Sequence, residues 1–224
     1  MKRAPFVLYC SLICAMACTG PARGGDTAPK DSRDENALTL TREFAEFGDM
    51  AAQFNLATAY EFGIGVPQDH AQAVYWYQKA AEQGLAVAQS NLGVMYAEGK
   101  GIARDLAQAV YWYEQAARQG DAKAQNNLGA EYYRGRVIAR DDVLAYKWWS
   151  LAARQGNANA QRNLKTLEAS LSAAQLADAQ ATLARHDTRA ARDLRSAKRT
   201  GVFRSGRCHK SAGLGLPPYP CFYD

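Results

Sequence analysis

The 224-residue chain has few of the residues on which most catalytic sites depend. It contains three histidines, His70, His186 and His209, and residues 19 to 207 contain no cysteine. It contains no G-x-S-x-G, H-E-x-x-H, G-x-x-x-x-G-K, C-x-x-C or S-x-x-K pattern, the patterns typical of common nucleophiles, zinc sites and phosphate loops. The sequence therefore predicts a protein that is not an enzyme and that binds no metal or cofactor.

The chain also lacks an apolar run long enough to cross a bilayer, which takes about 20 residues. Its apolar N-terminal segment runs only from Phe6 to Ala17, after Lys2 and Arg3, and ends in small residues. This layout is typical of a secretory signal peptide. With 48% hydrophobic and 22% charged residues, the rest of the chain has the composition of a folded globular protein. We expect residues 1–17 to be a signal peptide and the protein to be exported.

Cys18 follows Ala15-Met16-Ala17, a segment that resembles a bacterial lipobox, in which the cysteine is lipidated. Ordinary signal peptidase also prefers A-x-A, so both kinds of processing stay open. Cleavage after Ala17 leaves an odd set of three cysteines, and lipidation of Cys18 would leave Cys208 and Cys221 to form a disulfide in an oxidising compartment. Three unrelated thiols are the alternative. We expect a periplasmic protein or an outer-membrane lipoprotein, with residues 18–33 as a flexible tether.

A shift of 36 residues aligns the chain with itself. Gly48, Gly84, Gly120 and Gly156 fall in register, and so do Trp76, Trp112 and Trp148. A fixed period of this length predicts a solenoid, in which each unit buries its apolar face against its neighbours. The predicted repeats are residues 48–83, 84–119 and 120–155, with a degenerate fourth at 156–171.

Each unit has the apolar spacing of two helices. In the first unit, Gly63 can adopt positive φ and end the first helix, while Asp69 can cap the second helix. Trp76 recurs at one helical position in each repeat, which favours a core residue over a ligand cage. The predicted fold class is all-α: a right-handed α-solenoid superhelix of stacked helical hairpins.

The repeat resembles a known family, the Sel-one-like repeat (SLR) family, which is related to tetratricopeptide repeats. The resemblance covers residues 48 to 155 and implies a partner-binding scaffold, whose first helices line a concave groove. Some cysteine-rich relatives are linked to penicillin binding, which makes a hydrolase the enzymatic alternative, but those relatives carry paired cysteines inside each repeat. The residues that carry the resemblance are Leu92-Gly93-x-x-Tyr96, Gly99-x-Gly101, Asp105 and Ala109-x-x-Trp112-Tyr113-x-x-Ala116-Ala117-x-x-Gly120.

The same resemblance implies which side chains contact a protein or peptide partner, through the groove-facing positions of related helical repeats. These positions differ between the repeats of this chain, and the alternative is that they are merely solvated. The implied groove residues are Phe54, Thr58, Glu61, Ser90, Val94, Ala97, Asn126, Ala130, Tyr133 and Arg134.

Two flanking helices are expected to cap the solenoid. The first covers residues 34–47, with Ala37, Leu40, Phe44 and Ala45 as its apolar stripe. The second covers residues 172–200 and begins with a capping box, Ser172-x-x-Gln175. Residues 201–224 are expected to form an irregular tail.

The formal net charge of +5 is concentrated near the C-terminus, where residues 185–210 hold nine basic and two acidic residues. Arg185, Arg189, Arg192 and Arg199 share one helical stripe, which suits anionic lipid headgroups or an acidic polymer of the cell envelope. A solvated cap helix is the alternative. Nucleic acid is not expected, because no aromatic residues interleave with the arginines.

Overall fold

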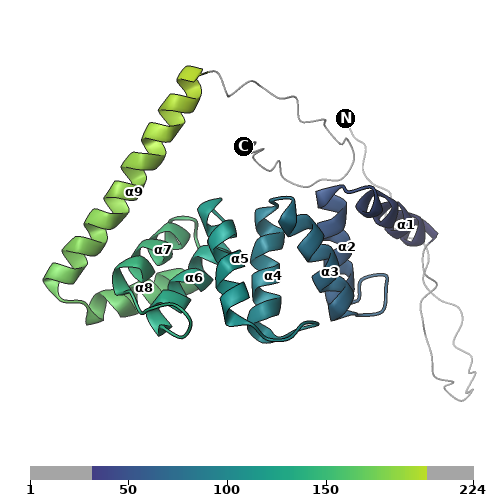
Figure 1. Ribbon diagram of the computed structural model, residues 1–224, viewed down its shortest axis with the longest axis horizontal. Coiled ribbons are helices and arrows are strands. Elements are labelled where there is room, and N and C mark those ends of the chain that lie inside the picture. The colour runs from purple at the N-terminus through teal and green to yellow at the C-terminus, as the bar shows by residue number, and fades with distance from the viewer. Residues whose placement is uncertain (1–31, 201–224) are drawn as a thin grey trace, which may run out of the picture.

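The computed structural model describes residues 32–200, which form nine helices and no strand. Successive hairpins stack side by side into an elongated body, with α1 at one end and α9 at the other (Figure 1). The predicted all-α solenoid is therefore confirmed. No helix within residues 32–200 is long and apolar enough to span a membrane. The helices are α1 (Ser32–Glu46), α2 (Met50–Phe62), α3 (His70–Glu82), α4 (Ala86–Glu98), α5 (Leu106–Arg118), α6 (Ala122–Arg134), α7 (Asp142–Arg154), α8 (Ala158–Ser170) and α9 (Ala173–Thr200).

Several predicted features lie outside the described residues. They are the signal peptide 1–17, the lipidation site Cys18, the tether except its last two residues, the Cys208–Cys221 disulfide and the tail 201–224.

The hairpins share the boundary residues that the sequence predicts. Gly63 has φ 70° and a left-handed conformation at the end of α2, and its amide donates to the carbonyl of Ala59. Glycine takes this conformation without a steric cost, because it has no Cβ. The carboxylate of Asp69 accepts hydrogen bonds from two amides in the first turn of α3, and so satisfies donors that a helix start leaves free.

The core lies between successive helices and is built mainly from alanines and leucines, with a buried aromatic ring at one recurring repeat position. Tyr77, Tyr113 and Trp149 supply the buried aromatic ring. The recurring tryptophans pack at the edge of this core. Trp148 is buried, whereas Trp76 and Trp112 are half-buried. The alanines bring the backbones close together, and the rings fill the remaining space.

Buried glutamines connect one repeat to the next. Gln89 donates through Nε2 to the carbonyl of Ala81 at 3.1 Å, and its Oε1 accepts from Gln119 at 2.8 Å. The same arrangement recurs one repeat earlier and one repeat later. Buried amides need partners, so each glutamine pair fixes the register of two neighbouring hairpins. The other pairs are Gln53 with Gln83 at 2.7 Å and Gln125 with Gln155 at 2.9 Å.

The N-terminal helix differs from the prediction in its apolar stripe. Ala45 is buried, but Leu40 and Phe44 are 53% and 57% exposed. Leu38 packs towards the core instead. The reason is that α1 lies at the end of the stack and packs mainly on α2, so a single narrow face is covered. The side chain of Ala37 lies outside the described residues.

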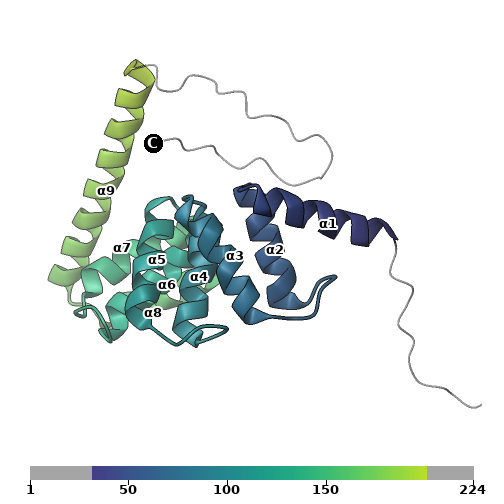
Figure 2. The same cartoon turned by 45° about the vertical axis from the view of Figure 1, so that its right-hand side comes forward.

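The C-terminal helix begins at the predicted capping box. The amide of Gln175 donates to Ser172 Oγ at 3.3 Å, and the amide of Ser172 donates to Gln175 Oε1 at 3.0 Å. Its first half packs on α7 through Ala179 and Leu183. Its second half extends beyond the repeats, as Figure 2 shows.

Candidate binding groove

The first helices of the hairpins line a cavity of about 510 Å³. Helices α4, α6 and α8 supply most of its wall, and Tyr113 reaches it from α5. Five of the ten predicted groove residues lie in this lining: Val94, Ala97, Asn126, Ala130 and Arg134.

A second cavity of about 220 Å³ adjoins the first and shares Ala130 and Arg134 with it. Tyr133, another predicted residue, lines it together with Trp149 and Leu167. The rings of Tyr133 and Trp149 are 5.5 Å apart, and the guanidinium of Arg140 lies 4.9 Å from the Tyr133 ring centre. Trp149 is held by a 3.0 Å hydrogen bond from Nε1 to the carbonyl of Asn126. The smaller cavity therefore has a fixed aromatic wall.

Three predicted groove residues from α2 contact a buried tyrosine and do not line either cavity. Phe54 packs against the ring of Tyr77, Thr58 lies 3.2 Å from its hydroxyl, and Glu61 accepts a 2.6 Å hydrogen bond from that hydroxyl. Burial, and then the hydrogen bond to Glu61, raise the pKa of Tyr77 well above its ordinary value. The hydroxyl therefore stays protonated and remains a donor.

Ser90 does not belong to the groove surface. It is completely buried, so a partner in the groove cannot contact it. The equivalent position in α6 is Asn126, which lines the larger cavity, so the difference lies in the short Ser90 side chain and its burial in the stack.

The groove wall also contains a buried carboxylate that was not predicted from the sequence. Glu131 is 5% exposed, and it accepts hydrogen bonds from Arg134 at 3.1 Å and Arg136 at 2.5 Å. The two preceding repeats place Ala59 and Met95 at this position. The sequence did contain a signal for this residue, because a carboxylate occupies a repeat position that is apolar in the two preceding repeats.

Asparagines form the polar lining beside these arginines. Asn126 donates to Asn127, and Asn163 donates to Asn126, both at 3.2 Å. Arg162 donates to Asn159. Each carboxamide offers two N–H donors and two acceptor lone pairs, so this network retains groups for a bound molecule. Among the described residues, no group of histidine, cysteine and acidic residues could hold a metal ion.

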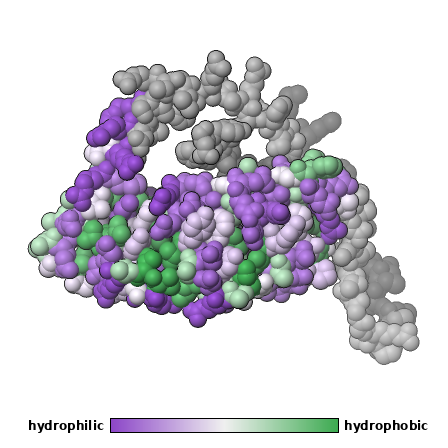
Figure 3. Space-filling model, in the orientation of Figure 1, coloured by the Kyte–Doolittle hydropathy of each residue, from purple (hydrophilic) through white to green (hydrophobic). Residues whose placement is uncertain are grey.

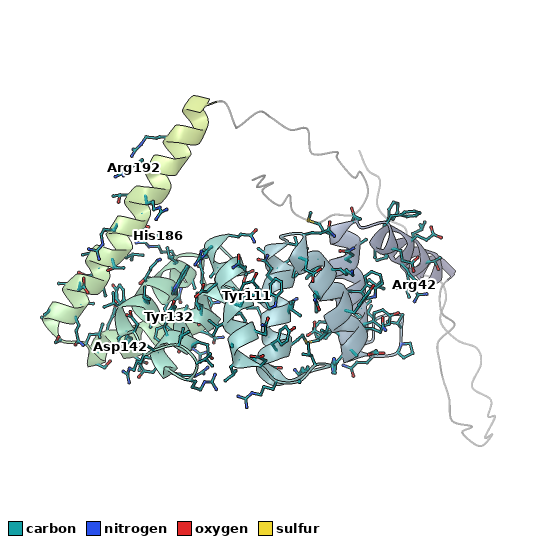
Figure 4. The ribbon with its side chains drawn as sticks, viewed as in Figure 1. Arg42, Tyr111, Tyr132, Asp142, His186 and Arg192 are labelled. Carbon is teal, nitrogen blue, oxygen red and sulfur yellow. The ribbon has the colours of Figure 1, made fainter. Side chains whose placement is uncertain are left out.

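The predicted basic stripe lies on α9. Arg185, Arg189 and Arg192 are exposed, while the side chain of Arg199 lies outside the described residues. Figure 4 shows His186 near the repeats and Arg192 on the part of α9 beyond them. This outer part is coloured as strongly hydrophilic in Figure 3. An ion pair at 2.9 Å between Arg154 and Asp187 joins α7 to α9.

Comparison with known proteins agrees with the repeat pattern. The Sel1 repeat family matches residues 51–85, 86–121 and 122–157. A Sel1 repeat protein from Oxalobacter formigenes is 41% identical over 58% of this chain and 98% of its own, with a TM-score of 0.54. A protective antigen of uropathogenic Escherichia coli with an SLR fold is 49% identical over 54% of this chain, with a TM-score of 0.53. The present chain spans only 26% of that antigen. A search of the curated proteins finds no significant match.

Proposed function

The chain belongs to the Sel1 repeat family, and we propose that it is a non-catalytic scaffold that binds a peptide or protein segment in the groove lined by α4, α6 and α8. Proteins with these repeats are generally protein-interaction scaffolds. The observation that carries the proposal is the cavity of about 510 Å³ on these first helices, with its smaller neighbour beside Tyr133. Six predicted groove residues lie in the two linings.

Blocking the groove tests this function. Ala130 lines both cavities, so Ala130→Trp fills the space that a peptide would occupy. Peptides selected from a random display library on the full chain should bind Ala130→Trp at least tenfold more weakly, by fluorescence anisotropy. The control is Gln108→Trp, at an exposed position of α5. Equal binding to the wild type and Ala130→Trp would place the peptides elsewhere and reject the groove.

We also propose that the protein is exported and acts in the periplasm or at the outer membrane. The support is the basic and apolar pattern of residues 1–17, the lipobox-like segment before Cys18, and the pair Cys208 and Cys221. Intact-mass measurement of the mature protein from its host tests all three features. A mass matching the unprocessed chain contradicts export, and an unmodified Cys18 contradicts lipidation.

A second candidate function is binding to anionic envelope lipid through α9. Arg192 is exposed on the part of the helix that extends past the repeats (Figure 4), and Arg189 is exposed about one turn before it. The double variant Arg189→Gln/Arg192→Gln should lose salt-sensitive co-sedimentation with phosphatidylglycerol vesicles. Arg104→Gln/Arg118→Gln removes the same charge from the repeats and serves as control. Equal losses in both variants would contradict a specific role of α9.

A further inference from the structure

We propose that the groove recognises an extended peptide segment that carries a carboxylate next to an apolar side chain. The carboxylate binds at the α6–α8 end, and the apolar side chain enters the smaller cavity. This inference rests on the proposed function and names the chemistry of its ligand.

The first argument is the distribution of charge along the groove. The lining holds three guanidinium groups, on Arg134, Arg136 and Arg162, all at the α6–α8 end. Two carboxylates accompany them. Glu98 lies on α4, where its 2.6 Å ion pair with Lys100 holds it at the other end of the groove. A ligand carboxylate is therefore attracted to α6 and α8, whereas the Glu98–Lys100 pair gives the α4 end no excess positive charge.

The hydrogen bonds to Glu131 use only some of the N–H donors of Arg134 and Arg136. A guanidinium has five N–H donors. Arg134 reaches Glu131 through Nη1, and Arg136 reaches it through Nε and Nη2. The side chains of Arg134 and Arg136 keep 54% and 40% of their surface exposed. The buried carboxylate thus holds both groups at the wall while leaving part of each accessible.

Within residues 32–200, Arg162 has no carboxylate partner. Among the described residues, its guanidinium donates only to the neutral side-chain amide of Asn159. A neutral acceptor leaves the positive charge uncompensated, and guanidinium pairs with carboxylate in a bidentate geometry. Arg162 is therefore the group that a ligand carboxylate would neutralise.

The asparagines favour a peptide over other anions. Asn126, Asn127 and Asn163 lie side by side in the groove wall and are linked at 3.2 Å. Carboxamides can donate to and accept from a peptide backbone at the same time. A nucleic acid strand would instead need aromatic platforms for its bases, and the larger cavity offers one tyrosine, Tyr113, whose ring is buried.

The smaller cavity determines which ligand side chain lies next to the carboxylate. Its walls include Tyr133, Trp149 and Leu167, and its volume of about 220 Å³ suits one apolar side chain. It shares Arg134 and Asn163 with the larger cavity. Consecutive residues of one extended segment can therefore fill both.

The test uses the full chain and fluorescent nonapeptides of glycine, serine and asparagine, whose ends are blocked unless stated otherwise. Three peptides carry Glu-Leu, Gln-Leu or Lys-Leu at the centre. Two others end in leucine, one with a free carboxylate and one with an amide, which separates a side-chain carboxylate from a chain-terminal one. We expect the Glu-Leu peptide, the free-acid peptide or both to bind at least about fivefold more tightly than their neutral counterparts, since a hydrogen-bonded charge pair is gained.

Charge variants then locate the contact. Arg162→Gln should remove the preference for carboxylate, and Glu98→Gln should leave or increase it. Arg118→Gln, on the outer helix α5, is the matched control and should change nothing. Unchanged binding of the Gln-Leu peptide to Arg162→Gln guards against misfolding, because an unfolded protein would lose the neutral peptide as well.

The outcomes separate the two proposals. If neutral and acidic peptides bind equally and Ala130→Trp blocks both, the carboxylate inference is wrong and the groove function stands. If no peptide binding depends on Ala130, the proposed function itself fails. Tighter binding of an oligothymidylate probe that is lost in Arg162→Gln would show that the groove takes nucleic acid and would overturn the inference.

Discussion

Gly93 shows how one residue determines the spacing of two helices. A Cβ at this position of α4 would lie 2.6 Å from the ring of Tyr113 on α5, closer than a carbon contact allows. Gly93→Ala would gain about 1 kcal/mol of helix propensity, but overpacking of a core costs about 1–3 kcal/mol. We expect the steric effect to win, with a net loss of up to about 2 kcal/mol in the free energy of unfolding measured in urea.

A second substitution isolates the cause. Tyr113→Leu creates space beside Gly93, so Gly93→Ala should cost less in that background than in the wild type. An equal cost in both backgrounds would show that the ring is not the obstacle.

A substitution at Gln89 measures how much the glutamine pairs between successive repeats, the glutamine ladder, contribute to stability. Gln89→Leu removes the side-chain donor to the carbonyl of Ala81, which keeps its hydrogen bond from the amide of Gly84, and it removes the acceptor of Gln119. A lost hydrogen bond costs about 0.5–1.5 kcal/mol. We expect a loss of that size in chemical unfolding. Gln72→Leu, at an exposed position of α3, should change stability by a few tenths of that amount. If both substitutions have the same effect, the ladder contributes nothing to stability.

At the scale of the element, the docking of α9 on α7 should depend on pH. Burial, and then the positive charge of Lys147, lower the pKa of His186 below its ordinary value of 6.5, although Asp187 raises it. The unfolded chain therefore binds the proton more readily than the folded one. The stability that neutral His186 provides is present above pH 6.5 and is lost as pH falls from there towards the folded-state pKa.

Thermal melts between pH 7.5 and 5.5 measure this effect. The wild type should lose more stability over this interval than His186→Asn, which carries no titrating ring. Hydrogen exchange should locate the loss in the first half of α9. Parallel pH profiles for the two proteins would exclude His186 as the cause.

The elements themselves follow from the sequence, but their contacts do so only in part. Gly63 and Asp69 mark helix boundaries by local chemistry, which needs no knowledge of the rest of the fold, and the structure confirms them. Leu40 was wrongly assigned to the core, because periodicity identifies an apolar face without showing whether a neighbour covers it. Ser90 was wrongly assigned to the groove for the same reason, because its repeat position lines the cavity in α6 through Asn126 but is buried in α4. Glu131 could have been predicted from the 36-residue comparison, and its partner Arg134 follows from the i,i+3 spacing within α6. Its other partner, Arg136, depends on how the loop after α6 folds back.

At the scale of the molecule, the repeats should be interchangeable modules. Deleting residues 85–120 joins Gly84 to Asp121 and removes one hairpin in register. Gln125 then takes the place of Gln89 beside Ala81, and Leu128 takes the place of Leu92, so α3 meets an equivalent partner in α6. Stability in a solenoid is a sum over repeats and their interfaces. The shortened protein should therefore remain folded, with unchanged helicity per residue. Its free energy of unfolding should fall by roughly 2–5 kcal/mol, about the share of 36 residues in a typical domain.

Deleting residues 85–102 removes half as much chain but brings α3 against α5, whose faces do not match, and should abolish the cooperative melt seen by circular dichroism. If the smaller deletion proves more stable than the larger one, the stability comes from contacts other than the repeated interface.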